Sequence, residues 1–179
     1  MFDLDSFLAD CLAARRETEP RRAIKEVVTR AVAGGRDVAA ALPPERAGIT
    51  RLHVSPDLTV LKVVWAPGMQ LWPHDHRMWA AIGIYTGGED NAFFRRSGTS
   101  LVDAGGRTLE PGAVCLLGDD VVHSVTNPTQ QFAGAIHVYG GDFFTEPRSE
   151  WPGIPYVEQP YDFERTRAHF EAANAQASA

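Results

Sequence analysis

The stretch WPHDHR, residues 72–77, places two histidines two positions apart in a segment with the texture of a strand. Side chains at positions i and i+2 of a strand point to the same face. His74 and His76 can therefore reach one metal ion, whereas Asp75 points away from it. A chance pair on a polar surface is the alternative, so the interpretation depends on the residues around the pair.

Outward from this stretch, residues 49–144 alternate short β-rich runs with turn residues at close intervals. The predicted strands are 49–54, 58–65, 70–74, 78–86, 91–96, 99–103, 113–117, 122–126 and 131–139. The predicted turns contain Ser55-Pro56-Asp57, Pro67-Gly68, Gly87-Gly88, Gly105-Gly106, Glu110-Pro111-Gly112 and Asn127-Pro128. Many short strands joined by Gly/Pro turns indicate a mainly β sandwich or barrel.

Helical segments flank this β region, and we expect one domain over residues 1–179. Residues 1–45 carry apolar side chains at helical spacing, interrupted at Pro20, with a short third helix that Asp37 is expected to cap. Residues 145–179 begin as a Pro-rich irregular arm. They end in a predicted C-terminal helix over 162–175.

Composition limits the partners and the compartment. The net charge of −6 and the lack of a long basic run argue against nucleic acid. No apolar run approaches the ~20 residues of a membrane span, and the acidic start MFDLDSFLAD does not resemble a signal peptide. Two isolated cysteines form no disulfide framework. We expect a cytoplasmic protein, either a monomer or a homodimer.

A third metal ligand must come from a different strand than the first two. His123, in DVVHS at 120–124, is the best candidate because its strand lies later in the same β region. The sequence therefore predicts a metal site formed by His74, His76 and His123.

The glycine and histidine spacing resembles that of the two cupin motifs. Gly68 and Gly87 flank the first histidine pair at the intervals of the first motif, and Gly112 and Asn127 flank His123 at those of the second. The resemblance implies a double-stranded β-helix, or jelly-roll barrel, that binds one metal. Ala80 stands where the first motif has a metal-binding Glu. The expected ligand set is then three neutral imidazoles, which leave the 2+ charge of the ion available to an anionic ligand such as a thiolate.

More narrowly, the chain resembles the cupin thiol dioxygenases, a group that includes cysteine dioxygenase and 3-mercaptopropionate dioxygenase. The His-Asp-His tripeptide, the N-terminal helices, AIHVY at 135–139 and ITRL at 49–52 are similar. This resemblance implies an Fe(II) cofactor and oxidation of a small thiol by O₂ to its sulfinate. It also implies catalytic roles for Tyr139, as a polar partner of substrate or dioxygen, and for His137, which would fix the tyrosine hydroxyl. Strand alternation agrees, because residues 137 and 139 share a face; packing in the core is the alternative.

The same resemblance leaves two arginines for one role. Arg51 matches a substrate-carboxylate arginine of cysteine dioxygenases, and Arg148 lies in the stretch that carries one in 3-mercaptopropionate dioxygenases. Ala135 replaces a serine of the family, so the outer hydrogen bond to His137 is expected to be absent or to come from water. Trp79 is expected either to line the substrate pocket or to pack in the core.

Two other readings of the same residues stay open at this stage. A three-histidine cupin can hold Zn²⁺, Ni²⁺ or Mn²⁺, or use iron and O₂ on a substrate other than a thiol. The protein can also be a cupin that binds a small ligand without catalysis.

Overall fold

The computed structural model describes residues 1–98 and 100–177. Within this part of the chain the strands form one five-stranded and one six-stranded sheet. The first sheet contains, in spatial order, β1 (Gly48–Val54), β2 (Thr59–Trp65), β9 (Ala133–Tyr139), β4 (Ala80–Thr86) and β7 (Val114–Leu117). The second contains β11 (Gln159–Pro160), β10 (Ser149–Glu150), β3 (Gln70–Asp75), β8 (Val122–Thr126), β5 (Glu89–Ser97) and β6 (Ser100–Leu109).

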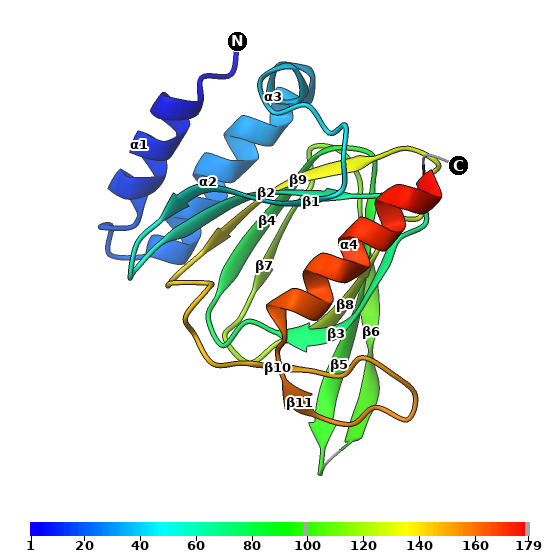
Figure 1. Ribbon diagram of the computed structural model, residues 1–179. Helices are drawn as coiled ribbons and strands as arrows, with labels where there is room; N and C mark the ends of the chain where they lie inside the picture. Colours follow the sequence, from blue (N-terminus) through cyan, green and yellow to red (C-terminus); the bar gives the residue numbers. More distant parts are fainter. Residues whose placement is uncertain (99, 178–179) are drawn as a thin grey trace.

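All the strand pairs are antiparallel, and the chain passes repeatedly from one sheet to the other (Figure 1). The central strand orders β2-β9-β4-β7 and β3-β8-β5-β6 are those of a jelly roll, because sequential strands alternate between sheets except at the β5–β6 hairpin. The predicted mainly β class and double-stranded β-helix are confirmed.

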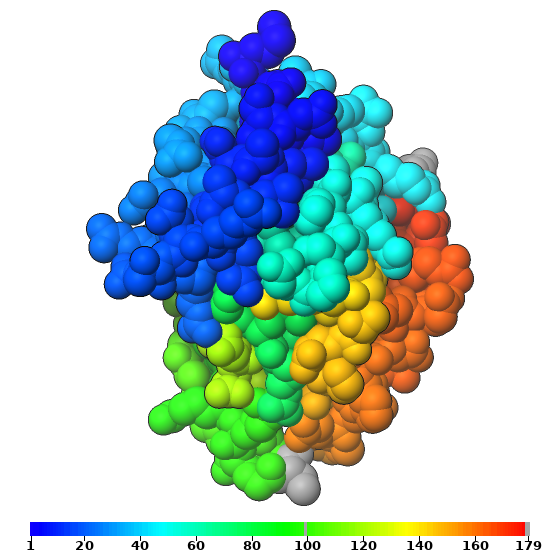
Figure 2. Space-filling view, turned by 90° about the vertical axis from the view of Figure 1, so that its left-hand side faces the viewer, coloured from blue at the N-terminus to red at the C-terminus, as the bar shows by residue number. Residues whose placement is uncertain are grey.

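Three helices cover the outer face of the first sheet (Figures 1 and 2): α1 (Leu4–Ala14), α2 (Pro20–Ala33) and α3 (Gly35–Ala41). Their apolar stripes bury Phe7, Ile24 and Val28 against outward-facing residues of β2, β4 and β9. At the closest approach β4 has a glycine, Gly83, where an added Cβ would lie 2.5 Å from Cγ1 of Val28. The small residue therefore lets α2 pack directly on the sheet.

A second apolar core fills the space between the two sheets. Leu61, Ile82 and Leu109 belong to it and are fully buried. Helix α4 (Phe163–Ala177) lies across the edge of this space in Figure 1, where Phe170 stacks on Trp65 with ring centres 5.3 Å apart. The C-terminal helix thus completes the interior core.

The structure differs from the sequence-based expectation in local details. Gly105-Gly106 is not a turn: it lies inside β6, where the register shifts and Gly105 adopts φ 94° as part of a bulge. The third helix begins at Gly35 rather than after Asp37. The expected arm contains the two short strands β10 and β11, and β10 pairs with β3. Residue 99 of the predicted strand 99–103 and residues 178–179 of the C-terminal segment lie outside the described residues.

None of the helices found in the described residues has both the length and the hydropathy that crossing a bilayer requires.

Candidate metal centre

Three histidines converge between the two sheets. His74 lies near the end of β3, His76 is the first residue beyond that strand, and His123 lies on the neighbouring strand β8, directly opposite His74. One ring nitrogen from each histidine lies within 4.8 Å of the others, and the residues are only 6%, 3% and 1% exposed. This grouping could hold a metal ion.

The ring orientations suit metal binding. Nδ1 of His74 lies 3.0 Å from the carbonyl oxygen of Trp72, and Nδ1 of His123 lies 2.7 Å from Oδ1 of Asn91. Each Nδ1 therefore donates its proton to an oxygen, which leaves the Nε2 lone pair free. Nε2 of His123 lies 3.4 Å from Nε2 of His76. Nitrogens that meet in this way fit a shared divalent cation.

Electrostatics keeps the three rings neutral. Burial lowers the pKa of His74 from 6.5 to about 4; the hydrogen bond to the Trp72 carbonyl opposes this shift and the charge of Arg148 adds to it. Burial also holds the pKa values of His76 and His123 well below 6.5, and mutual repulsion among neighbouring histidines adds to the effect. Neutral imidazole is the form that binds metal, so the site needs no deprotonation at neutral pH.

Asp75, between the two ligands of β3, is fully buried but turned away from the cluster. Its Oδ2 forms an ion pair with Nε of Arg77 at 2.7 Å and accepts a hydrogen bond from Arg96. Its Oδ1 accepts a hydrogen bond from the backbone N–H of Ser149 at 2.8 Å. These contacts hold the end of β3, between His74 and His76, in place. The carboxylate itself is not part of the nitrogen cluster, as strand alternation predicts.

His137 and Tyr139 of β9 point into the space between the sheets. Nδ1 of His137 lies 2.9 Å from the Tyr139 hydroxyl, and the Tyr139 ring centre lies 5.0 Å from that of His76. Burial raises the pKa of Tyr139, with Arg148 opposing the shift, so the hydroxyl keeps its proton at neutral pH. Burial lowers the pKa of His137 to about 3, and that ring is neutral too.

Arg148, just before β10, is only 6% exposed, and its charge acts on His74 and His76. Its guanidinium carbon lies 4.0 Å from the ring centres of Phe143 and Tyr161, and Nη1 donates to the carbonyl oxygen of Phe143. Nε and Nη2 are buried without a hydrogen-bond partner. A buried guanidinium with two free donors is costly unless a ligand accepts from it.

Arg51 and Trp79 are not brought to the histidines. Arg51 is exposed on β1, in a groove beside α4, with its guanidinium carbon 3.8 Å from the Phe144 ring centre. Trp79 is buried in the core beneath α1–α3, on the outer face of the first sheet, where it packs against Gly140. Of the two expectations for Trp79, the geometry matches core packing.

Two residues of β5 were missed by the sequence analysis. Glu89 and Asn91 are almost fully buried, and Asn91 contacts His123 directly. The available signal is the spacing of residues 89, 91 and 93, which places the three side chains on one face of a strand. The predicted strand begins at residue 91, so Glu89 lies outside it and the pattern is not recognised. Burial raises the pKa of Glu89 to about 7, against hydrogen bonds from Asn91 and Trp65.

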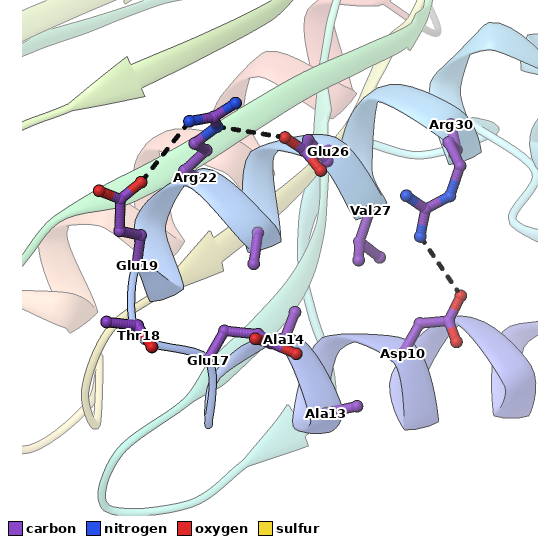
Figure 3. A pocket seen from close by; sticks show the side chains of 11 residues that line it. Asp10, Ala13, Ala14, Glu17, Thr18, Glu19, Arg22, Glu26, Val27 and Arg30 are labelled. Carbon is purple, nitrogen blue, oxygen red and sulfur yellow. Dashed lines mark hydrogen bonds and ion pairs between the residues drawn. The ribbon is translucent and has the colours of Figure 1, made fainter.

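A separate hollow lies between α1 and α2 (Figure 3). Arg22 pairs with Glu19 and Glu26 along its rim, and Arg30 pairs with Asp10. Its charged side chains pair with one another, and both helices lie outside the first sheet. The hollow is therefore no part of the histidine site.

Fold and site together define a double-stranded β-helix protein with a three-histidine cluster that could bind metal. No model of a known protein family matches the sequence. Similar solved structures include a cupin family protein from Methanocaldococcus jannaschii, at 12% identity and TM-score 0.48 over 57% of this chain and 86% of that one. An uncharacterized conserved protein with a double-stranded β-helix domain from Klebsiella pneumoniae matches at 12% identity and TM-score 0.46, over 61% and 82%.

An oxalate oxidase solved with the substrate analogue glycolate matches at 18% identity and TM-score 0.43, over 55% of this chain and 52% of that one. The matched region thus spans about half of that enzyme. These likenesses are to cupin-type barrels, and the fold assignment itself rests on the sheet topology described above.

Proposed function

We propose that this protein is an iron-dependent thiol dioxygenase that oxidises a small, carboxylate-bearing thiol to its sulfinate. The observation that carries the proposal is the meeting of three neutral imidazoles with the buried guanidinium of Arg148, whose Nε and Nη2 have no hydrogen-bond partner. Both atoms of O₂ are added to sulfur, so the reaction RSH + O₂ → RSO₂H balances without an external reductant. Iron(II) held by His74, His76 and His123 would supply the chemistry that joins sulfur to oxygen.

The absence of a carboxylate from the nitrogen cluster supports a thiolate ligand. Among the described residues, one cluster of histidine, cysteine or acidic side chains is arranged to hold a metal, and it consists of His74, His76 and His123 alone. Such a set adds no negative charge, so the full charge of the metal ion would attract a thiolate and lower the pKa of the bound thiol.

Arg148 is suited to bind the other end of the substrate. The free Nε and Nη2 groups form the fork that fits a carboxylate in two parallel hydrogen bonds. Phe143 and Tyr161 pack on the guanidinium and exclude water from it. A carboxylate fixed here would hold a short thiol in one orientation relative to the histidines.

Tyr139 supplies a hydroxyl on the same side of the barrel. Its proton can be donated to His137, whose Nδ1 lies 2.9 Å away, while the hydroxyl oxygen remains able to accept a hydrogen bond. We infer that His137 fixes the hydroxyl and that the Tyr139 oxygen orients bound substrate by accepting a hydrogen bond from one of its donor groups.

Oxygen uptake tests the proposal. Metal-free protein is loaded with Fe(II) without air and then assayed aerobically with 3-mercaptopropionate, cysteine, mercaptosuccinate and cysteamine, and the products are weighed by mass spectrometry. We expect a product 32 mass units heavier than the thiol, from the two added oxygen atoms, and faster turnover of the carboxylates than of cysteamine. Protein loaded with Zn²⁺ is the matched control. No uptake with any of the four thiols would rule out the proposed reaction.

The donor set also favours a second candidate, a cupin enzyme that uses another metal. Three histidines with an open position are a common catalytic site for Zn²⁺, which activates water. Metal analysis of the purified protein, followed by activity after reloading with each metal, separates the two. A protein that binds a small carboxylate and turns over none of the substrates would instead be a non-catalytic binder.

A further inference from the structure

Glu89 is a fully buried acid that the proposed function does not use. Its Oε1 accepts a hydrogen bond from Nδ2 of Asn91, and its Oε2 accepts one from Nε1 of Trp65, both at 2.9 Å. The neutral ring of His137 also lies nearby, with its Nε2 3.9 Å from Oε2. A buried carboxylate is energetically costly. Glu89 starts two series of side-chain contacts, each of which contains a histidine, and these contacts suggest a role for the acid.

The first chain runs from Glu89 through Asn91 to His123. A carboxylate only accepts hydrogen bonds, so Asn91 must turn its NH₂ group toward Glu89 and its Oδ1 toward His123. Nδ1 of His123, 2.7 Å from that oxygen, must then carry the ring proton. The lone pair is left on Nε2, the nitrogen that faces His76 at 3.4 Å. The polarity of the chain thus selects the tautomer of His123 that can bind metal.

The second chain runs from Glu89 through His137 to Tyr139. Nε2 of His137 is buried without a hydrogen-bond partner and faces the carboxylate, which favours a proton on that nitrogen. Nδ1 is then the acceptor for the Tyr139 hydroxyl at 2.9 Å. Ala135, two residues before His137 on the same face of β9, has only a methyl group and cannot form a hydrogen bond with the ring. The acid that faces His137 therefore comes from the other sheet.

We propose that Glu89 is a positioning residue whose single carboxylate sets the tautomers of both His123 and His137, and so links the metal-binding cluster to the hydroxyl of Tyr139. The proposal rests on the metal-binding part of the proposed function and is independent of thiol oxidation. It identifies one residue that both halves of the site share.

The decisive variant is Glu89→Gln, which keeps the shape of the side chain but adds a donor. Its amide cannot accept from both Trp65 and Asn91, so Asn91 is driven to turn its NH₂ toward His123. The matched control is Asp90→Asn, the same chemical change at the adjacent position of β5. The Asp90 side chain points away from the site, where its Oδ1 accepts a hydrogen bond of 2.6 Å from the Thr108 hydroxyl.

Two readouts at pH 8 are used, neither of which needs activity. Affinity for Zn²⁺ is measured by competition with a chromophoric chelator, and the ring tautomers of metal-free protein are read from ¹⁵N–¹H correlation spectra of histidine. For Glu89→Gln we expect roughly 10- to 100-fold weaker Zn²⁺ binding, the usual effect of losing an outer partner of a ligand. We also expect altered tautomers at His123 and His137. Asp90→Asn should match the wild type in both readouts.

Glu89→Asp covers the case in which the glutamine variant fails to fold. It keeps an acceptor-only group, so the wild-type tautomers should be retained even where Zn²⁺ affinity falls through the shorter reach. Unchanged tautomers in folded Glu89→Gln would overturn the proposal, whatever happens to affinity. If the wild-type protein binds no Zn²⁺, the metal site fails, while the tautomers of the metal-free protein still decide the role of Glu89.

Discussion

On strand β9, His137 and Tyr139 point into the space between the sheets, whereas Ile136 and Val138 point toward helices α1 to α3. All four side chains are at most 3% exposed. On the outer face the buried groups are apolar and their packing is complete. On the inner face the same burial encloses polar groups, and Nε2 of His137 has no hydrogen-bond partner. Equal burial therefore encloses apolar packing on one face and polar groups, one of them with an unpaired nitrogen, on the other.

The two candidate arginines repeat this contrast. Each places its guanidinium over a phenylalanine ring, Arg51 over Phe144 at 3.8 Å and Arg148 over Phe143 at 4.0 Å. Arg51 is exposed to water, which satisfies its donors, whereas two donors of Arg148 are buried and unsatisfied. Lack of a partner inside the protein, rather than the stacking contact, is what distinguishes Arg148 from Arg51, and it is the reason we propose Arg148 as the substrate-binding arginine.

The largest effect on folding should come from the outer face. Trp79→Ala removes a buried ring beneath the helices and should lower the free energy of unfolding by about 3–5 kcal/mol. The milder Trp79→Phe should cost less and leave Zn²⁺ affinity and the KM for thiols unchanged. Urea titration measures the first effect, and steady-state kinetics the second. A raised KM in Trp79→Phe at unchanged stability would mean that Trp79 lines the substrate site after all.

The paired arginine variants should give the largest effect on turnover. Arg148→Gln should lower kcat/KM for a carboxylate-bearing thiol roughly 100-fold, because about 3 kcal/mol of charged hydrogen bonding is lost. Cysteamine, which has no carboxylate, should be turned over at a similar rate by wild type and variant. Arg51→Gln, the matched control, should stay within about twofold of wild type for both substrates. A large loss in Arg51→Gln with none in Arg148→Gln would reverse the assignment.

A smaller effect is expected when the metal-free protein is acidified: its free energy of unfolding should fall with each pH unit. His74 and His137 have pKa values of about 4 and about 3 in the folded state, against 6.5 for a free histidine. Below pH 6.5 the unfolded chain therefore binds protons that the folded protein does not. Each such histidine should remove about 1.4 kcal/mol of stability per pH unit as the pH falls toward its folded pKa. His76 and His123 act in the same direction.

Glu89 opposes this trend, because its folded pKa is raised to about 7 from 4.5. Its contribution is complete below pH 4.5 and is lost as the pH rises to about 7, and one acid does not offset four histidines. Unfolding midpoints in the presence of a chelator should fall between pH 6.5 and pH 5. Excess Zn²⁺ should reduce the decline by favouring the folded state with its neutral ligands. A midpoint that does not change over this interval would show that the histidines are not buried as neutral rings.

Local patterns were sufficient for most of the fold. Alternation and Gly/Pro turns located β1 to β9 to within a few residues, except that β6 continues to Leu109, and they missed the short strands β10 and β11. The resemblance to the cupin motifs implied the jelly roll. The exception at Gly105-Gly106 has a physical reason. A glycine pair permits a tight turn and a strand bulge equally well, and the pairing of β6 with β5 selects the bulge.

The site was predictable only in part. The pair His74 and His76 follows from strand geometry, because a period of two is a local property of the backbone. Glu89 entered no prediction, because its role depends on Asn91 two residues along the strand and on His137 from the other sheet. Such relations are created by packing and leave little trace in a single local window.

By itself, the sequence determined what local chemistry dictates: which segments are strands, which faces of them are polar, and that His74 and His76 share a face. The tertiary structure alone decided that Arg148 and not Arg51 lies beside those histidines, that Trp79 faces the helices, and that one carboxylate contacts both Asn91 and His137. The physical reason is that burial and the loss of water around a polar group arise only when segments distant in sequence close over it.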